Sequence, residues 1–154
     1  MSTKQQTLKA PISFSGKGLH TGVRVTMTIK PAAEDHGIVF RRIDLEGAPT
    51  VPALCEYVVD TSRGTTVEKD GVRVATIEHV MSALWTLGVD NAEIDIDAAE
   101  TPIMDGSAKE YAERIVETGL TDQDSERRYY HVTEKMVYTC LLYTSPSPRD
   151  VEES

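Results

Sequence analysis

Apolar and polar residues alternate strictly over Val23–Lys30. This period of two predicts a strand that buries one face and exposes the other, as in an antiparallel sheet packed on one side. The same alternation over Ala92–Asp97 predicts another half-buried strand, and Ile38–Phe40 is a shorter apolar run of the same kind. Much of the N-terminal half of the chain is therefore expected to form a sheet.

Two segments have the pattern of a hairpin. Asp70-Gly71 lies between two β-prone runs in Thr65–Val74, and this pair suits a two-residue turn that needs positive φ at both positions. The glycine-rich segment 15–22 reads Ser-Gly-Lys-Gly-Leu-His-Thr-Gly. Its spacing does not match a phosphate-binding loop, and its plain structural interpretation is a turn between two strands.

Helical spacing of apolar residues appears twice. The first run predicts a helix over Ile77–Leu87, capped by Thr76 and ended by Gly88. The second predicts a helix that starts after Ser107 with a capping box and ends before Gly119. Its expected buried stripe is Tyr111, Ala112, Ile115 and Val116. Strands interleaved with two helices predict an α+β fold in which a sheet is layered against both helices.

The pattern changes after the second helix. The polar segment 121–128 is expected to be a linker, and Tyr129–Tyr138 returns to a strand-like pattern. Residues 139–154 contain two Ser-Pro pairs and differ abruptly from what precedes them. These changes predict a first domain over residues 1–122, a linker and first strand of an incomplete second domain over 123–138, and a non-native tail over 139–154.

Composition narrows the class of protein. The chain has 154 residues and a net charge of −9, which suits a soluble globular domain and argues against binding of nucleic acid or an anionic membrane surface. No stretch has the length of a transmembrane segment, and the first residues lack the apolar core of a secretory signal. Two cysteines are too few for a disulfide scaffold or a four-thiolate zinc site. The expected location is the cytoplasm.

The pair Glu78-His79 is the first candidate for chemistry. A carboxylate beside an imidazole can act as a general base next to a metal ligand, although a carboxylate at a helix start is also favoured by the helix dipole alone. The stronger His-Glu-x-x-His motif is absent, since His79 is preceded by Ile77-Glu78 and followed at position 83 by alanine. His36 and His131 lack neighbouring partners in the sequence and are expected to be surface or strand residues.

Three segments together carry a family resemblance. In order along the chain they are Ser15–Gly22, Thr76–His79 and Pro102–Ala108, the last reading Pro-Ile-Met-Asp-Gly-Ser-Ala. Their order and spacing resemble the N-terminal half of UDP-3-O-acyl-N-acetylglucosamine deacetylase, over about residues 7–138. Members of this family carry out the committed step of lipid A synthesis in Gram-negative bacteria.

The resemblance implies a zinc-dependent amide hydrolase with two similar α+β domains and UDP-3-O-acyl-N-acetylglucosamine as substrate. His79 matches the first ligand of Zn²⁺, and Glu78 matches the general base that activates the water on the metal. Leu19 and His20 match residues beside the substrate pocket. Asp105 is expected to organise the turn before the second helix.

The chain also departs from the family. The other ligands form a His-x-x-x-Asp motif in the second domain, whereas His131 is followed four residues later by Lys135. The resemblance therefore implies an incomplete fragment that binds zinc weakly, lacks activity by itself, and self-associates through the exposed inter-domain face. The alternative is a non-catalytic binding or assembly module that keeps the fold.

Overall fold

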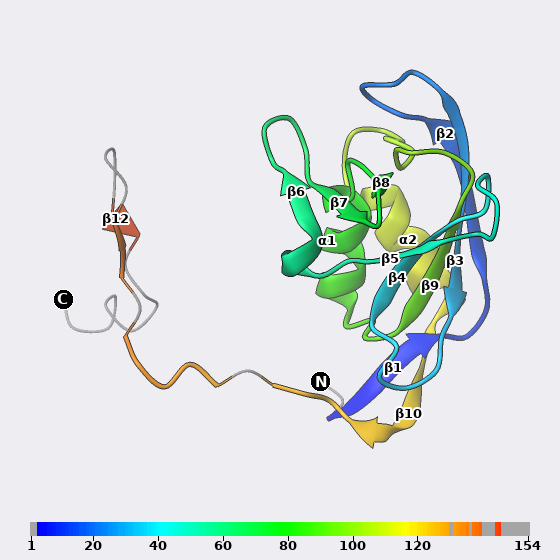
Figure 1. Cartoon of the computed structure of the whole chain (residues 1–154). Helices are drawn as coiled ribbons and strands as arrows, with labels where there is room; N and C mark the ends of the chain where they lie inside the picture. Colours follow the sequence, from blue (N-terminus) through cyan, green and yellow to red (C-terminus); the bar gives the residue numbers. More distant parts are fainter. Residues whose placement is uncertain (1–2, 130, 136, 140–143, 146–154) are drawn as a thin grey trace.

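The computed structural model describes residues 3–129, 131–135, 137–139 and 144–145. Its largest sheet has five strands in the order β2-β3-β9-β4-β5 (Figure 1). These strands are β2 (Ile12–Lys17), β3 (Arg24–Pro31), β9 (Ala92–Ile96), β4 (Ile38–Arg42) and β5 (Thr50–Pro52). Neighbouring strands are antiparallel except β4 and β9, which are parallel. The expected antiparallel sheet is thus a mixed one, because a period of two does not encode the direction of the partner strand.

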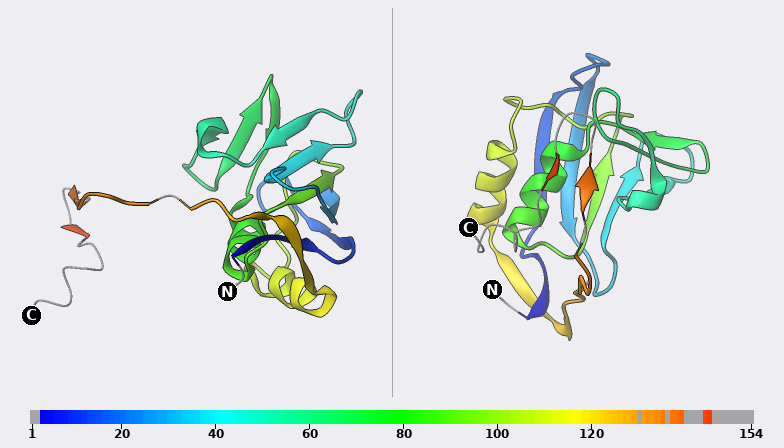
Figure 2. Two further views of the ribbon diagram at one scale, coloured as in Figure 1. Left: turned by 90° about the horizontal axis from the view of Figure 1, so that it is seen from below. Right: turned by 90° about the vertical axis from the view of Figure 1, so that its left-hand side faces the viewer.

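The helices α1 (Glu78–Leu87) and α2 (Lys109–Thr118) cover one face of this sheet (Figure 2). The alternation predicted for β3 and β9 is confirmed. Their alternating apolar residues are buried beneath the helices, namely Val25, Met27 and Ile29 on β3 and Ala92, Ile94 and Ile96 on β9. On the other face, Lys30 Nζ lies 2.6 Å from Glu93 Oε1 and 2.9 Å from Asp95 Oδ2. Val23, expected on the buried face, is 54% exposed because β3 starts one residue after it.

Both helices end at the predicted glycines but start differently. Gly88 has φ 79°, and its N–H bonds to the carbonyls of the last turn of α1. Thr76 does not cap α1, because it has φ 59° and its hydroxyl donates to Glu100 instead. The N-cap of α2 is Ala108 rather than Ser107, whose hydroxyl accepts from the N–H of Lys109.

The predicted stripe of α2 is only partly buried. Tyr111 and Ile115 are buried, whereas Val116 is 65% exposed. Val116 follows Ile115 directly and therefore lies beyond the narrow face that α2 turns toward the sheet.

A second, three-stranded sheet lies beside the helices and contains the strands β6 (Val58–Asp60), β7 (Thr66–Lys69) and β8 (Val72–Val74). A short 3-10 helix, η1 (Cys55–Tyr57), leads into β6. The predicted hairpin is confirmed, since Lys69 pairs with Val72 and both Asp70 and Gly71 have positive φ. This sheet carries one wall of the site described below.

The polar segment 121–128 was expected to be a linker, but its residues 121–126 lie in a strand. β10 (Leu120–Glu126) pairs antiparallel with β1 (Lys4–Leu8) at the lower end of the body (Figure 1). Arg127 then donates to Asp90 from Nε at 2.9 Å and from Nη2 at 2.7 Å. The linker interpretation was wrong because backbone pairing with β1 stabilises a segment whose own side chains are mostly exposed.

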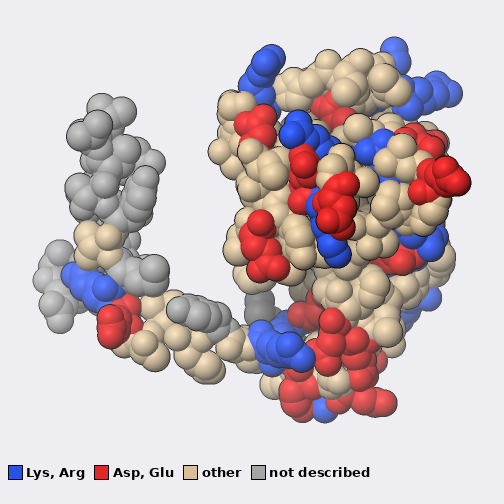
Figure 3. Space-filling model, in the orientation of Figure 1, with Lys and Arg blue, Asp and Glu red and all other residues tan. Residues whose placement is uncertain are grey.

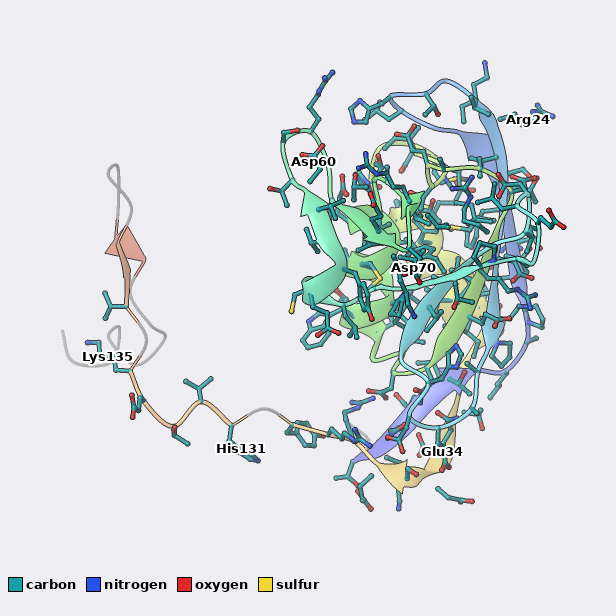
Figure 4. The ribbon with its side chains drawn as sticks, in the orientation of Figure 1. Arg24, Glu34, Asp60, Asp70, His131 and Lys135 are labelled. Carbon is teal, nitrogen blue, oxygen red and sulfur yellow. The ribbon has the colours of Figure 1, made fainter. Side chains whose placement is uncertain are left out.

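The described residues after residue 129 extend away from the sheets and helices, as the labelled His131 and Lys135 show in Figure 4. The strand expected over Tyr129–Tyr138 is absent from its described residues, except where β11 (Tyr138–Thr139) pairs with β12 (Thr144–Ser145). Cys140 and most of the predicted tail lie outside the described residues. Within the described part of the chain, no helix is both long enough and apolar enough to cross a membrane.

Candidate active site

A hollow of about 250 Å³ lies at the end of the molecule where β6 ends and the β2–β3 turn begins. Figure 4 shows Asp60 and Arg24 at this end, with Glu34 at the opposite end. The lining comes from three elements far apart in the sequence and consists of His20, Asp60, Arg63, Gly64, Thr66, Ala75 and Thr76. The hollow thus brings His20 of the glycine-rich segment next to Thr76, two residues before the start of α1.

Glu78 is not itself a lining residue, but it bonds to Thr65, which lies between the lining residues Gly64 and Thr66. Its Oε2 accepts a hydrogen bond from the N–H of Thr65 at 2.8 Å, which ties the carboxylate to the β6–β7 connection. A Cβ built on Gly64 would lie 3.1 Å from Glu78 Oε1, so Gly64 leaves little room between its backbone and the carboxylate. Oε1 takes no part in this hydrogen bond, and a carboxylate oxygen left in this way can accept a proton.

His79 follows Glu78 on the first turn of α1 and is half-buried. Its Nδ1 is buried and has no hydrogen-bond partner among the described residues. A buried unpaired imidazole nitrogen costs free energy unless another group satisfies it, and a metal ion is one such group. In the described ranges, no group of three His, Cys, Asp or Glu side chains could hold a metal ion. The unpaired Nδ1 leaves His79 able to bind a metal ion, whereas the described residues do not supply a full set of ligands.

His20 is held over the hollow by its backbone and by its ring. Its Nε2 lies 3.1 Å from the carbonyl oxygen of Arg63, which links the β2–β3 turn to the β6–β7 connection. Leu19, the neighbouring predicted residue, is 55% exposed and is not among the lining residues. Of these residues, His20 lines the hollow, Glu78 bonds to Thr65 beside it, and Leu19 is largely exposed.

Glu100 is a further residue of this site that sequence reasoning missed. It is 1% exposed, yet its carboxylate accepts hydrogen bonds from both sides of the hollow. The turn supplies His20 N at 3.0 Å, Thr21 N at 2.8 Å and Thr21 Oγ1 at 2.7 Å, and the start of α1 supplies Thr76 Oγ1 at 2.8 Å.

These bonds decide the charge of Glu100. Burial by itself raises the pKa of a carboxyl group, but the donors of His20, Thr21 and Thr76 outweigh it and lower the pKa of Glu100 to about 2. The side chain is therefore a carboxylate at neutral pH, fully paired and buried. Only the glycine at position 18, where a Cβ would lie 2.3 Å from Glu100 Oε2, signals this contact in the sequence.

The segment Pro102–Ala108 lies against the end of β2, since the N–H of Ile103 donates to the carbonyl of Lys17 at 2.9 Å. Asp105 Oδ1 accepts from the N–H of Ser107 at 2.9 Å and from its hydroxyl at 2.8 Å, so the predicted role of Asp105 in the turn is confirmed. Both bonds lower the pKa of the Asp105 carboxyl group, and the bond from the Ser107 hydroxyl has the larger effect. The hydroxyl of the buried Tyr111 donates to the carbonyl of Pro102, which fixes this segment to α2.

Comparison of the sequence with known proteins points to one family. Residues 5–144 match the sequence model of the UDP-3-O-acyl N-acetylglycosamine deacetylases. The chain is 50% identical over 126 residues to the UDP-3-O-acyl-N-acetylglucosamine deacetylase of Myxococcus xanthus, covering 82% of this chain and 40% of that protein. It is 46% identical over 135 residues to a bifunctional enzyme LpxC/FabZ of Bacteroides thetaiotaomicron, covering 88% of this chain and 29% of that protein. The chain thus spans less than half the length of these curated relatives.

Proposed function

Since the chain belongs to the UDP-3-O-acyl-N-acetylglucosamine deacetylase family, we propose that it supplies the first half of a deacetylase active site. The substrate of this reaction is UDP-3-O-acyl-N-acetylglucosamine, and the bond cleaved is the amide of its N-acetyl group. The reaction is the committed step of lipid A biosynthesis, and the proposed location is the cytoplasm. One observation carries the proposal: the Glu78 carboxylate, directly before His79, bonds to the N–H of Thr65 beside the hollow that His20 lines.

Glu78 is proposed to be the general base. The N–H of Thr65 holds Oε2, so the carboxylate presents Oε1 in a fixed direction. A carboxylate held in this way can take a proton from water as that water attacks the N-acetyl carbonyl. Its position next to His79 would keep it close to a metal held by His79 without making it a ligand.

His79 is proposed to be one ligand of a zinc ion. When bound, zinc would polarise the carbonyl and lower the pKa of water toward neutrality. A catalytic site of this kind needs three protein ligands, and the described residues contain no group of three that could hold a metal ion. We therefore expect the 154-residue chain by itself to bind zinc weakly and to release no acetate from the substrate.

A chimera tests this proposal. Residues 3–129 would replace the matching part of the Myxococcus xanthus relative, and acetate release would be measured beside the 154-residue chain alone. We expect the chimera to be active and the chain alone to be inactive. An inactive but folded chimera, as judged by its circular dichroism and melting, would contradict the proposal and favour a non-catalytic module.

A further inference from the structure

The buried carboxylate of Glu100 contacts both sides of the hollow. Oε1 accepts from His20 N at 3.0 Å and from Thr76 Oγ1 at 2.8 Å. Oε2 accepts from Thr21 N at 2.8 Å and from Thr21 Oγ1 at 2.7 Å. One side chain therefore joins the turn that carries His20 to the residue two positions before Glu78.

The backbone around Glu100 is itself held in place. The N–H of Thr101 donates to the carbonyl of Ala75 at 3.1 Å, and the N–H of Ala75 donates to the carbonyl of Ala99 at 2.9 Å. Thr101 Oγ1 also donates to the carbonyl of Thr76 at 2.6 Å. These bonds keep Thr76 at φ 59°, a conformation that a β-branched residue adopts only under constraint. Glu100 is thus anchored to the segment that begins α1.

The contacts continue beyond Glu100 in a closed path. His20 Nε2 lies 3.1 Å from the carbonyl of Arg63, and two residues later the N–H of Thr65 donates to Glu78 Oε2. Glu100 therefore reaches Glu78 by two routes, through Thr76 along the chain and through His20 across the hollow. A group that joins both routes controls how far His20 and Glu78 lie from each other.

We propose that Glu100 is a positioning residue, whose buried carboxylate holds the turn with His20 at a set distance from Glu78. Its role in catalysis rests on the proposed function, since Glu78 and His20 are the groups that it positions. Glu100 itself lies behind the hollow and touches no reacting atom. Four hydrogen bonds to one buried carboxylate hold its partners rigidly in place. Moving any donor away is costly, because it leaves part of the buried negative charge without a hydrogen bond.

The test uses the full 154-residue chain and needs no activity. Amide hydrogen exchange and ¹⁵N shifts would be compared between the chain, Glu100→Gln, and Glu93→Gln, whose carboxylate lies on the far face of the sheet beside Lys30. In Glu100→Gln we expect exchange at His20 and Thr21 to rise roughly tenfold or more, and exchange at the Thr65 amide to rise with it. The Glu93→Gln control should leave all three amides unchanged.

A milder pair covers the case in which Glu100→Gln does not fold. Thr21→Val removes the hydroxyl that donates to Oε2, and Thr21→Ser keeps it. We expect Thr21→Val to raise exchange at His20 and Thr65, and Thr21→Ser to restore protection. Changes at His20 and Thr21 with an unaltered Thr65 amide would overturn the proposal, since Glu100 would then stabilise only its own turn. Because these measurements need no turnover, an inactive chimera would count against the proposed function alone.

Discussion

Gly18 lies so close to Glu100 that a Cβ at position 18 would stand 2.3 Å from Glu100 Oε2 and 2.3 Å from Thr21 Oγ1. The position needs glycine because there is no space for a side chain. Its backbone conformation does not require glycine, since its φ is not in the left-handed region. Gly18→Ala should therefore push the turn away from Glu100 and lower the free energy of unfolding by about 1–3 kcal/mol. Denaturant melting measures this change.

Gly22→Asn is the matched control in the same turn. Gly22 has φ 64°, which asparagine tolerates, and no atom lies within 4 Å of a Cβ built there. We expect this variant to melt close to the parent chain. If Gly18→Ala were as stable as Gly22→Asn, the close contact between the turn and Glu100 would be contradicted.

Glu100 also predicts a dependence of stability on pH. Its pKa in the folded chain is about 2, below the ordinary value of 4.5, so it stabilises the fold fully above about pH 5. This contribution, of about 3 kcal/mol at most, is lost as the pH falls from 4.5 toward 2. Denaturant melting should give a free energy of unfolding that is higher for the chain than for Glu100→Gln at neutral pH. This difference in free energy should become smaller as the pH falls from 4.5 toward 2. A difference independent of pH would show that the carboxylate charge does not matter.

The domain boundary near residue 122 stays a prediction, but β10 suggests where a shortened chain would keep its stability. β10 pairs with β1, and Arg127 bonds to Asp90 beyond the end of α1. A chain ending at residue 129 should therefore melt within a few degrees of the full chain, whereas one ending at residue 119 should melt well below it. Similar melting of both shortened chains would mean that β10 adds nothing.

Figure 3 shows acidic side chains gathered at the end of the body formed by β1 and β10. Two of them make local contacts, since Glu34 Oε1 accepts from the N–H of Ser125 and Lys4 Nζ lies 2.7 Å from Glu126 Oε1. The hydrogen bonds from Ser125 lower the pKa of the Glu34 carboxyl group, and the bond from the Ser125 hydroxyl has the largest effect. Pairing of this kind explains how an acidic segment can form a strand, which its composition did not predict.

The local elements were predictable and the long-range site contacts were not. Asp70-Gly71, Gly88 and the alternation of β9 act within a few residues, so sequence patterns identify them. Glu100 meets His20 across 80 positions, and β1 meets β10 across more than 110, so neither alternation nor helical spacing of residues identifies these contacts. Glu78 and His79 were candidates as a carboxylate beside an imidazole, the family resemblance supplied their expected roles, and the structure adds their neighbours.

Self-association stays a proposal, and exposed apolar side chains support it. Trp85 on α1 is 86% exposed and Val116 on α2 is 65% exposed, in a chain that spans only part of its relatives. We expect light scattering of the 154-residue chain to show dimers or larger species, and Trp85→Ser with Val116→Ser to shift them toward monomer. A monomer in the parent chain at the same concentration would contradict this expectation.

The central claim is that Glu78 and His79 divide the work of a hydrolytic centre, one as base and one as metal ligand. The most direct test measures bound zinc and acetate release together in the chimera, for Glu78→Gln, His79→Ala and the exposed control Glu46→Gln. We predict that His79→Ala loses both zinc and activity, and that Glu78→Gln keeps zinc while its rate falls at least a hundredfold, in the range typical of a lost general base. Glu46→Gln should match the parent chimera. Full zinc content in His79→Ala, or a rate in Glu78→Gln near that of the parent, would contradict the account.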